Sequence, residues 1–232
     1  MLKSILTLST LLLSATALPS GLPHNPRSLS PRNGPCATHA QKADNDADTG
    51  GPGVQLHNAD GSAHSYFVYA NSCDAIPLKY TSIAGGASKF IALPAGFQGR
   101  IVRGSEAVNL DGRPHLLGTW LEITLDNPGS GWSDVSLIRG CDGAVTVAAW
   151  DGSGVSTGFQ DQGILDEAPQ GILEGAVIKA TEGLASVVVQ PVVDYLARKI
   201  GYDKAYIDDY HGNPVISSAN QRFQATFYRG RP

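Results

Sequence analysis

The stretch Gly118–Cys141 reads GTWLEITLDNPGSGWSDVSLIRGC, and its pattern decides the predicted fold. Two runs within it alternate between apolar and polar residues, and a polar turn segment joins them. A period of two is typical of a β-strand with one face in a core and the other face outside it. If the runs pair as a hairpin, Glu122 and Asp134 share the polar face. They then form either an acidic cleft or two separate solvated carboxylates.

Further strand-like runs lie on both sides of this stretch, at 54–57, 66–69, 89–93, 98–103, 144–150, 214–217 and 223–228. Gly, Pro, Asn and Asp separate them, and Asp60-Gly61 after the first run is a hairpin signal. Many short strands with such turns favour a β-sandwich or a β-barrel. We expect the last run to pair back into the sheet beside the first strands.

One region changes to the period of a helix. Apolar residues between 174 and 188 fall on one stripe, Pro191 opens a second helix, and Gly201 stops it. We therefore predict a small helical elaboration at about 174–200. Its polar face lacks a basic cluster, so we interpret it as packed on the sandwich rather than active at a membrane.

The composition fits one large domain, or one domain with an elaboration, in 232 residues. Only 16% of residues are charged, while 27 Gly and 14 Pro suit a β domain with many loops. The net charge of -4 gives no electrostatic footprint for nucleic acid.

The N-terminus has the pattern of a secretory signal peptide. A basic start at Lys3 precedes the apolar run 5–13, and small residues at Ala15 and Ala17 favour cleavage after Ala17. We assign 1–17 to the signal peptide and expect a secreted, extracellular protein. No later stretch has the length of a membrane span.

Residues 18–53 are rich in Pro, Ser, Asn and Asp, and we predict a disordered leader there, followed by a domain at 54–232. The run 44–50, DNDADTG, resembles the start of a calcium loop. Its glycine comes one residue late, and Gln55 stands where a bidentate Glu is required. A solvated linker is the preferred interpretation, and we predict no metal site.

Three cysteines permit one disulfide and leave one thiol over. Cys73 and Cys141 both lie in the strand-rich region, so we pair them. Cys36 is then free, linked to another chain or removed by processing.

Five segments in order resemble the thaumatin-like superfamily, in particular a low-cysteine fungal branch that includes the Blastomyces yeast-phase-specific proteins. They are Asn71–Cys73, Pro94–Ile101, Thr119–Leu125, Trp132–Gly140 and Phe223–Tyr228. The resemblance implies a thaumatin-like jelly-roll β-sandwich over 54–232. Tyr228 stands near the position of the family's closing Cys, which supports Cys141 as the replacement partner of Cys73.

The resemblance also implies an acidic cleft lined by an Arg, a Glu and several Asp. Carried onto this chain, these are Arg103 (with Arg100 as the alternative), Glu122, Asp134 and Asp208, the last within 203–209. Another expected Asp falls on Arg139. Trp120 shares the face of Glu122 by parity, either as a platform for a sugar or as packing.

These residues leave binding and catalysis open and favour binding. In a glucanase, Glu122 would be the acid and Asp134 the base or nucleophile, but Arg139 would lower their pKa, which is the wrong direction for the acid. We expect a secreted thaumatin-like binding protein, such as a fungal effector or virulence factor. The alternatives are a weak endo-β-1,3-glucanase and a secreted inhibitor of a protease or glycosidase.

The expected partner is cell-wall β-glucan or a host or extracellular protein, bound by a monomer without a cofactor and without nucleic acid. The run 208–211, DDYH, is interpreted as a polar loop. His57 and His64 flank the predicted hairpin turn and lack a nearby metal-ligating Cys or Glu.

Overall fold

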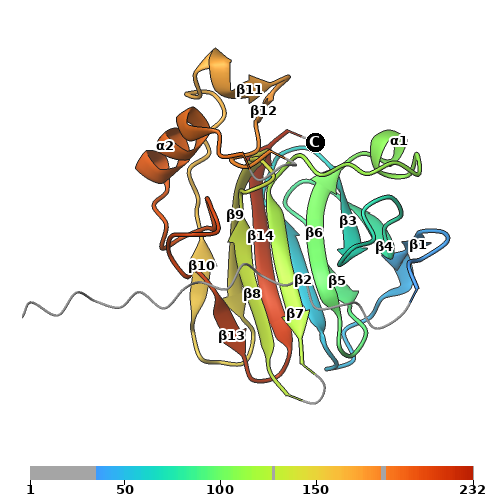
Figure 1. Cartoon of the computed structure of the whole chain (residues 1–232). Helices are drawn as coiled ribbons and strands as arrows, with labels where there is room; N and C mark the ends of the chain where they lie inside the picture. The colour runs from blue at the N-terminus through green and yellow to red at the C-terminus, as the bar shows by residue number, and fades with distance from the viewer. Residues whose placement is uncertain (1–34, 127–128, 184–186, 232) are drawn as a thin grey trace, which may run out of the picture.

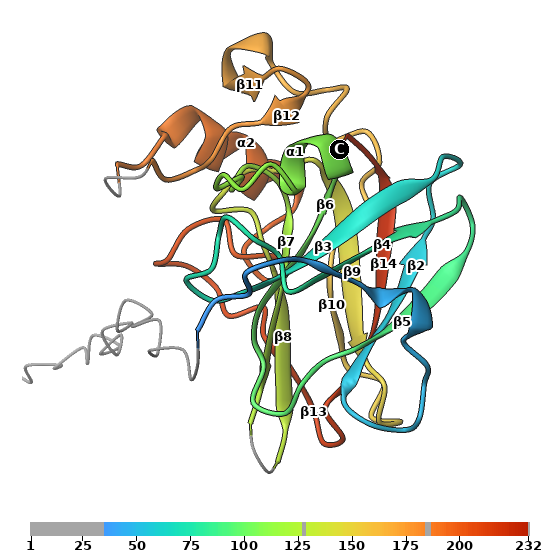
Figure 2. The same ribbon diagram turned by 90° about the vertical axis from the view of Figure 1, so that its right-hand side faces the viewer.

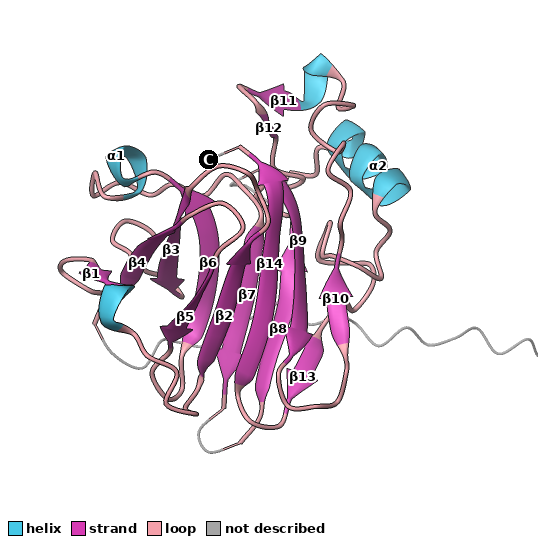
Figure 3. Cartoon of the chain, turned by 180° about the vertical axis from the view of Figure 1, so that it is seen from behind, coloured by secondary structure: helices cyan, strands magenta, loops and turns pink. Residues whose placement is uncertain are grey.

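The computed structural model describes residues 35–126, 129–183 and 187–231. In this part of the chain two β-sheets pack face to face, seen edge-on in Figure 2, and the two α-helices lie at one end of them (Figure 1). Figure 3 shows that strands make up the body of the molecule. The predicted mainly β sandwich with few helices is confirmed. The predicted signal peptide 1–17 and residues 18–34 of the predicted leader lie outside the described residues.

Within the described ranges the larger sheet has the order β1-β4-β3-β6-β7-β8-β13. Its strands are β1 (Gln41–Lys42), β3 (His64–Ala70), β4 (Lys79–Ile83), β6 (Gln98–Gly104), β7 (Trp120–Leu125), β8 (Gly131–Ser136) and β13 (Ile216–Ser218). The pairs are antiparallel except β1 with β4. The predicted hairpin is β7–β8, and Glu122 lies directly opposite Asp134, as its parity predicts.

The smaller sheet has the order β10-β9-β14-β2-β5 in the described part of the chain. Its strands are β2 (Gly53–Asn58), β5 (Ser88–Ala92), β9 (Gly143–Ala149), β10 (Ser156–Gly158) and β14 (Arg222–Gly230). The C-terminal strand β14 lies in the middle of this sheet, parallel to β2 and antiparallel to β9. The expected return of the last strand to the first ones is confirmed.

Alternation explains the core between the sheets. The inward side chains of the opening hairpin, among them Leu121, Ile123 and Val135, are at most 1% exposed. Phe223 and Phe227 of β14 are fully buried in the same cluster from the other sheet. Burying one such side chain contributes about 1.5–3 kcal/mol. The polar residues between them therefore stand on the outer faces.

The Asp60-Gly61 signal marks a crossing between sheets rather than a hairpin. β2 pairs with β14 and β5, whereas β3 pairs with β4 and β6. The two histidines do not bond to each other: His57 bonds to Ser88 Oγ at 2.9 Å, and His64 bonds to Asp60 at 2.9 Å. A local turn signal cannot specify which distant strand completes the ladder.

The helical elaboration is shorter than predicted. Among the described residues of this region, α2 (Gln190–Lys199) is the only α-helix, with Pro191 in its first turn and Gly201 at φ 85° after its end. The expected helix before it is wrong: the 3-10 helix η2 (Gln170–Ile172), short strands β11 (Leu173–Glu174) and β12 (Val177–Ile178), and loops occupy that stretch. Leu184 of the predicted stripe lies outside the described residues.

Tertiary hydrogen bonds replace that first helix. Ile178 and Cys141 exchange backbone hydrogen bonds of 2.9 and 3.0 Å, and Thr181 N donates to Ile138 O at 3.1 Å. Gly175 at φ 59° further disfavours a helix. Among the described residues, no helix has the length and apolar character to cross a membrane.

Residues 41–53 are ordered, in contrast to the expected disordered leader. β1 and the 3-10 helix η1 (Ala43–Asn45) lie along the sandwich, and Ala43 is fully buried. Asp46 bonds to Lys79 at 2.8 Å, and Asp48 bonds to Arg222 at 2.5 Å. Charged partners 33 and 174 residues away in the sequence hold this segment, and composition alone does not reveal such partners. The ordered part of the chain therefore begins before Val54.

The predicted Cys73–Cys141 disulfide is wrong. Cys36 is bonded to Cys73, with the two Cα atoms 5.5 Å apart, and Cys141 is a buried free thiol. The parallel pairing of β1 with β4 leads the N-terminal segment past the loop that carries Cys73. Cys141 instead lies in the core beneath β12, where it takes part in the bridge with Ile178.

Candidate functional site: a cleft with charges of both signs

A cleft of about 440 Å³ opens on the outer face of the larger sheet. The residues that line it come from the loop after β3, from β6, from β7 and the loop before it, from the end of β8 and the segment after it, and from the segment that follows α2. The charged and aromatic residues among them are Asp74, Arg100, Trp120, Glu122, Arg139 and Asp209. Three carboxylates and two guanidinium groups thus share one cleft.

Strand pairing brings the central residues together. Arg100 on β6 is the register partner of Glu122 on β7, which is in turn the partner of Asp134 on β8. Neighbouring strands lie roughly 4.8 Å apart, so these three residues form one row across the sheet. Their neighbours along each strand, such as Ile101 and Leu121, point inward and fix the row on the outer face.

Arg100 is the most constrained charge of the cleft. Its guanidinium lies 4.1 Å from the Trp120 ring centroid and 4.8 Å from that of Tyr69, and Nη1 bonds to Asp74 at 2.8 Å. The residue is only 3% exposed, and within the described chain Nε and Nη2 have no hydrogen-bond partner. Burial lowers the pKa of Arg100, and the negative charge of Asp74 opposes that shift.

The two candidate catalytic carboxylates differ in access. Glu122 is half-buried and lines the cleft, whereas Asp134 is 5% exposed and is not among the lining residues. Arg139 lines the cleft and donates from Nη1 to Glu182 O at 3.3 Å. Parity therefore placed both carboxylates on the correct face, but only one of them reaches the cleft.

Arg103 lies outside the cleft, whereas Arg100, the alternative, lines it. Arg103 shares the inward parity of Ile101, is 5% exposed, and donates from Nη2 to Tyr228 O at 2.7 Å. It lines a separate pocket of about 390 Å³ together with Asp142. The alternation of QGRIVR could have separated the two arginines, because Ile101 must point into the core.

Asp208 also lies outside the cleft, and its neighbour Asp209 lines it. Asp208 is 4% exposed and accepts hydrogen bonds from the backbone of Tyr210 and His211, so it holds a turn. The backbone N of Asp209 donates to Glu182 Oε1 at 3.4 Å. Burial raises the pKa of Glu182, and the charge of Asp209 adds to that shift.

An aromatic layer beside the cleft was missed. Phe67 and Tyr80 stack with centroids 5.8 Å apart, and Tyr69 and Trp120 continue the layer toward the cleft. One ring face of Trp120 is occupied by Arg100, and its Nε1 donates to Leu116 O at 2.9 Å. Packing is therefore the main role of this ring. The alternating run 66–69 contained the signal, because its outward positions are also aromatic.

The acidic run 44–50 does not converge on one point. Asp44, Asp46 and Asp48 bond separately to Lys89, Lys79 and Arg222. Across the described residues there is no group of three or more His, Cys, Asp or Glu side chains arranged to hold a metal ion.

Comparisons with known proteins were made for the whole chain. No protein-family model and no curated protein matches it. Among solved structures, the protein elicitor MoHrip2 from Magnaporthe oryzae is similar with a TM-score of 0.42 and 10% identity, over 77% of this chain and 99% of that one. The thaumatin-like xylanase inhibitor TLXI is similar with a TM-score of 0.43 and 14% identity, over 76% and 98%.

Proposed function

We propose that this protein is a secreted, thaumatin-like binding protein whose cleft recognises cell-wall β-glucan. The observation that carries the proposal is the row of Arg100 and Glu122 in an open cleft, with Arg100 fixed between two aromatic rings. A polar site held in place before its ligand arrives avoids part of the ordering cost of binding.

The chemistry of the cleft suits hydroxyl groups. A glucan hydroxyl can donate to a carboxylate such as Glu122 or Asp209 and accept from a guanidinium such as Arg139. Hydrogen bonds with one ionised partner are roughly twice as strong as those between neutral groups. Because both signs are present, a neutral polyol fits better than a polyanion or a polycation.

Hydrolysis is the less favoured use of the same residues. It requires an acid that stays protonated and a second carboxylate near the scissile bond. Asp134 is buried and is not among the residues that line the cleft, so it is not placed to act as the second carboxylate beside Glu122. Glucanase activity is therefore kept as the alternative outcome of the experiment below.

Secretion and the thaumatin-like assignment are part of the proposal. The signal-peptide pattern at 1–17 and the Cys36–Cys73 disulfide support an oxidising, extracellular compartment. The five motifs that follow one another in the family's order between Asn71 and Tyr228 support the thaumatin-like assignment. Among its members, the low-cysteine fungal branch fits best, since the described chain has one disulfide.

Co-sedimentation with insoluble β-1,3-glucan tests the cleft. We expect the wild-type protein to sediment with the glucan, and Glu122→Gln and Trp120→Leu to weaken this by roughly tenfold. Trp132→Leu is the matched control, because Trp132 lies on the same hairpin, is 44% exposed and does not line the cleft.

Equal binding by all four proteins would contradict the proposal. If the wild type releases reducing sugar from the glucan and Glu122→Gln does not, the function of the cleft is catalysis rather than binding. Release that persists in Glu122→Gln would exclude this cleft as the catalytic site.

A protein partner is the second candidate, and one observation favours it. Tyr210 follows the cleft residue Asp209 and is 67% exposed, and Val187 is 65% exposed. Exposed Tyr is enriched in protein interfaces. If the partner is a host protein or a secreted hydrolase, Tyr210→Ala should weaken that complex and leave glucan sedimentation unchanged.

A further inference from the structure

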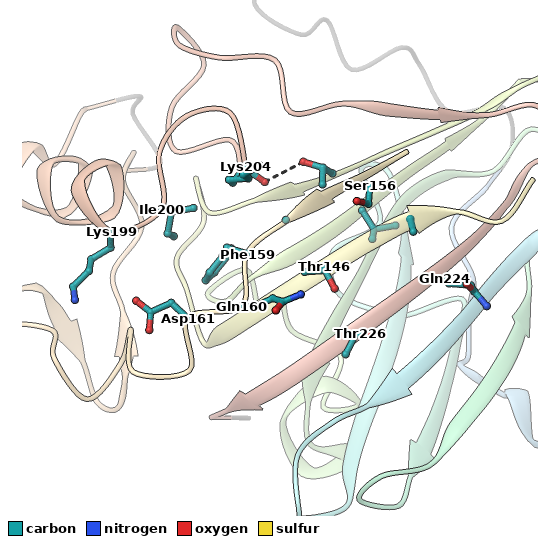
Figure 4. A pocket seen from close by; sticks show the side chains of 14 residues that line it. Thr146, Ser156, Phe159, Gln160, Asp161, Lys199, Ile200, Lys204, Gln224 and Thr226 are labelled. Carbon is teal, nitrogen blue, oxygen red and sulfur yellow. Dashed lines mark hydrogen bonds between the residues drawn. The ribbon is translucent and has the colours of Figure 1, made fainter. Parts of the chain in front are cut away.

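A second pocket, of about 640 Å³, lies on the outer face of the smaller sheet. It is bounded by β9, β10 and β14, by the segment 159–161, and by the end of α2 with Lys204 beyond it (Figure 4). It shares no lining residue with the cleft. The two depressions belong to different sheets and face away from each other.

Alternation again sets which side chains reach this pocket. Val145, Ala225 and Phe227 point into the core, so Thr146 and Thr226 point outward, directly opposite each other on β9 and β14. Gln224 is placed one outward position further along β14. The floor of the pocket is therefore uncharged and hydroxyl- and amide-bearing.

A glycine allows β10 to pair closely with β9 beside this floor. Gly158 lies opposite Thr146 at φ 100°, and a Cβ there would stand 2.3 Å from Val145 O. Thr157 Oγ1 and Gly158 N both donate to Lys204 O, at 3.2 and 3.0 Å. These two hydrogen bonds fix the end of β10, and Phe159 and Gln160 follow directly after it.

The polar groups of the pocket are available to a ligand. Within the described residues, five of the lining side chains make no side-chain hydrogen bond: Thr146, Ser156, Gln160, Gln224 and Thr226. Each hydroxyl or carboxamide can both donate and accept. A sugar ring presents hydroxyl groups of the same dual kind.

The charged groups of the pocket do not favour an ion. Lys199 and Asp161 lie together at one end, while Gln224 and Thr226 lie at the other (Figure 4). Lys199 is paired with Glu167, and Asp161 accepts a hydrogen bond from Gly163 N at 2.9 Å. The carbonyl end of α2, which carries partial negative charge, also borders the pocket.

We propose that this pocket binds a neutral hexose oligosaccharide, independently of the cleft. The molecule then carries two glycan-binding sites on opposite faces of the sandwich and can bridge two polysaccharide chains. Binding of the oligosaccharide in this pocket does not depend on what the cleft binds, whereas the bridging of two chains rests on the function proposed for the cleft.

Amide chemical-shift mapping with laminarihexaose and cellohexaose as probes tests the proposal. We expect shifts in β9, β10 and β14 with at least one hexaose, and a roughly tenfold loss of that binding in Thr146→Val/Thr226→Val. Valine keeps the shape of threonine, and the substitution exchanges the hydroxyl for a methyl group. Gln224→Ala, at an exposed position, is the second variant and should weaken binding without lowering Tm.

Two further proteins separate this site from the cleft. Glu122→Gln should leave the shifts in β14 unchanged, and Thr124→Val on β7 should bind like the wild type. The proposal is overturned if neither hexaose shifts β9, β10 and β14, if Thr146→Val/Thr226→Val and Gln224→Ala bind as well as wild type, or if inorganic phosphate binds there and the hexaoses do not.

Discussion

At the scale of single residues, burial decides the chemistry of the groups around Cys141. The thiol is 0% exposed, and burial raises its pKa to about 12. Neighbouring Asp142 is 4% exposed, and burial raises its pKa as well, although Arg103 opposes that shift. Asp142 accepts a hydrogen bond from Thr119 N at 2.9 Å, and its own backbone N donates to Thr119 Oγ1 at 3.2 Å.

Cys141 should not react with thiol reagents in the folded protein. Its thiolate is scarce at neutral pH and the sulfur is buried, so a disulfide-exchange reagent has neither a nucleophile nor access. We expect no titratable thiol in native protein and one after denaturation without reductant. A thiol titration in the presence and absence of guanidinium measures this. Three thiols after denaturation would contradict the Cys36–Cys73 bond.

Asp142→Asn should flatten the pH dependence of stability above pH 4. The folded-state pKa of Asp142 is raised above the ordinary value of 3.8, so the folded protein binds the proton more readily than the unfolded chain. The protonated carboxyl of Asp142 therefore stabilises the folded state below pH 3.8, and this contribution is lost as the pH rises through the folded-state pKa. Urea denaturation between pH 3 and pH 7 measures the slope.

Asp48→Asn is the control with the opposite sign. Its hydrogen bond from Arg222 lowers the pKa of Asp48, so this group stabilises the fold above pH 3.8 and loses that effect as pH falls. An unchanged slope in Asp142→Asn, together with a changed acid limb in Asp48→Asn, would show that Asp142 is not the group responsible.

At the scale of elements, the segment 36–48 acts as a strap across the sandwich. The disulfide fixes one end beside the cleft, where Ser72 and Asp74 flank Cys73, and the bond from Asp48 to Arg222 fixes the other. Ser72 has φ 62°, an uncommon conformation for a residue with a Cβ. The disulfide therefore joins the strap covalently to the loop that forms one wall of the cleft.

Cys36→Ser/Cys73→Ser should destabilise the fold and the cleft together. Removing a cross-link over this many residues costs about 4 kcal/mol in the chain-entropy model. Asp74 is then less firmly held against Arg100, so glucan sedimentation should weaken as well. Chemical denaturation and sedimentation measure the two effects. Cys141→Ser is the matched control that keeps the disulfide, and a double variant as stable as the wild type would contradict the stabilising role of the Cys36–Cys73 bond.

Helix α2 shows how one element depends on the sandwich. Val192, Val193 and Leu196 are at most 4% exposed and belong to the main core cluster. Leu196→Ala should cost about 2–5 kcal/mol because it leaves a cavity that the two sheets cannot fill. Arg198→Ala, on the exposed side, should change stability by less than about 0.5 kcal/mol. Thermal or urea unfolding distinguishes them.

At the scale of the whole molecule, β14 joins the two halves of the chain. It pairs with β2 from the start of the ordered chain and with β9 from its middle, and one core cluster includes both sheets and α2. We therefore expect a single cooperative unfolding transition. Far-ultraviolet and near-ultraviolet circular dichroism should give the same midpoint in urea. A separate, earlier transition would mean that α2 and its neighbours unfold independently.

The opening hairpin, most of the long strands, the second helix and the central place of Glu122 could be predicted from local pattern. Those features depend on alternation, on a proline and on a glycine, which act within a few residues. The strand β4, the sheet to which β2 belongs and the choice between Arg100 and Arg103 were not predicted correctly, although parity held the information for the arginines.

The sequence by itself determined the mainly β architecture and the face on which Glu122 and Asp134 stand, because side-chain direction in a strand follows from its period. Only the tertiary structure decided which cysteine pairs with Cys73, that the acidic run 44–50 is bound by Lys89, Lys79 and Arg222, and that Asp134 is buried while Asp209 lines the cleft. Each of these depends on which segments, distant in sequence, meet when the two sheets close on a common core, and no local pattern encodes that encounter.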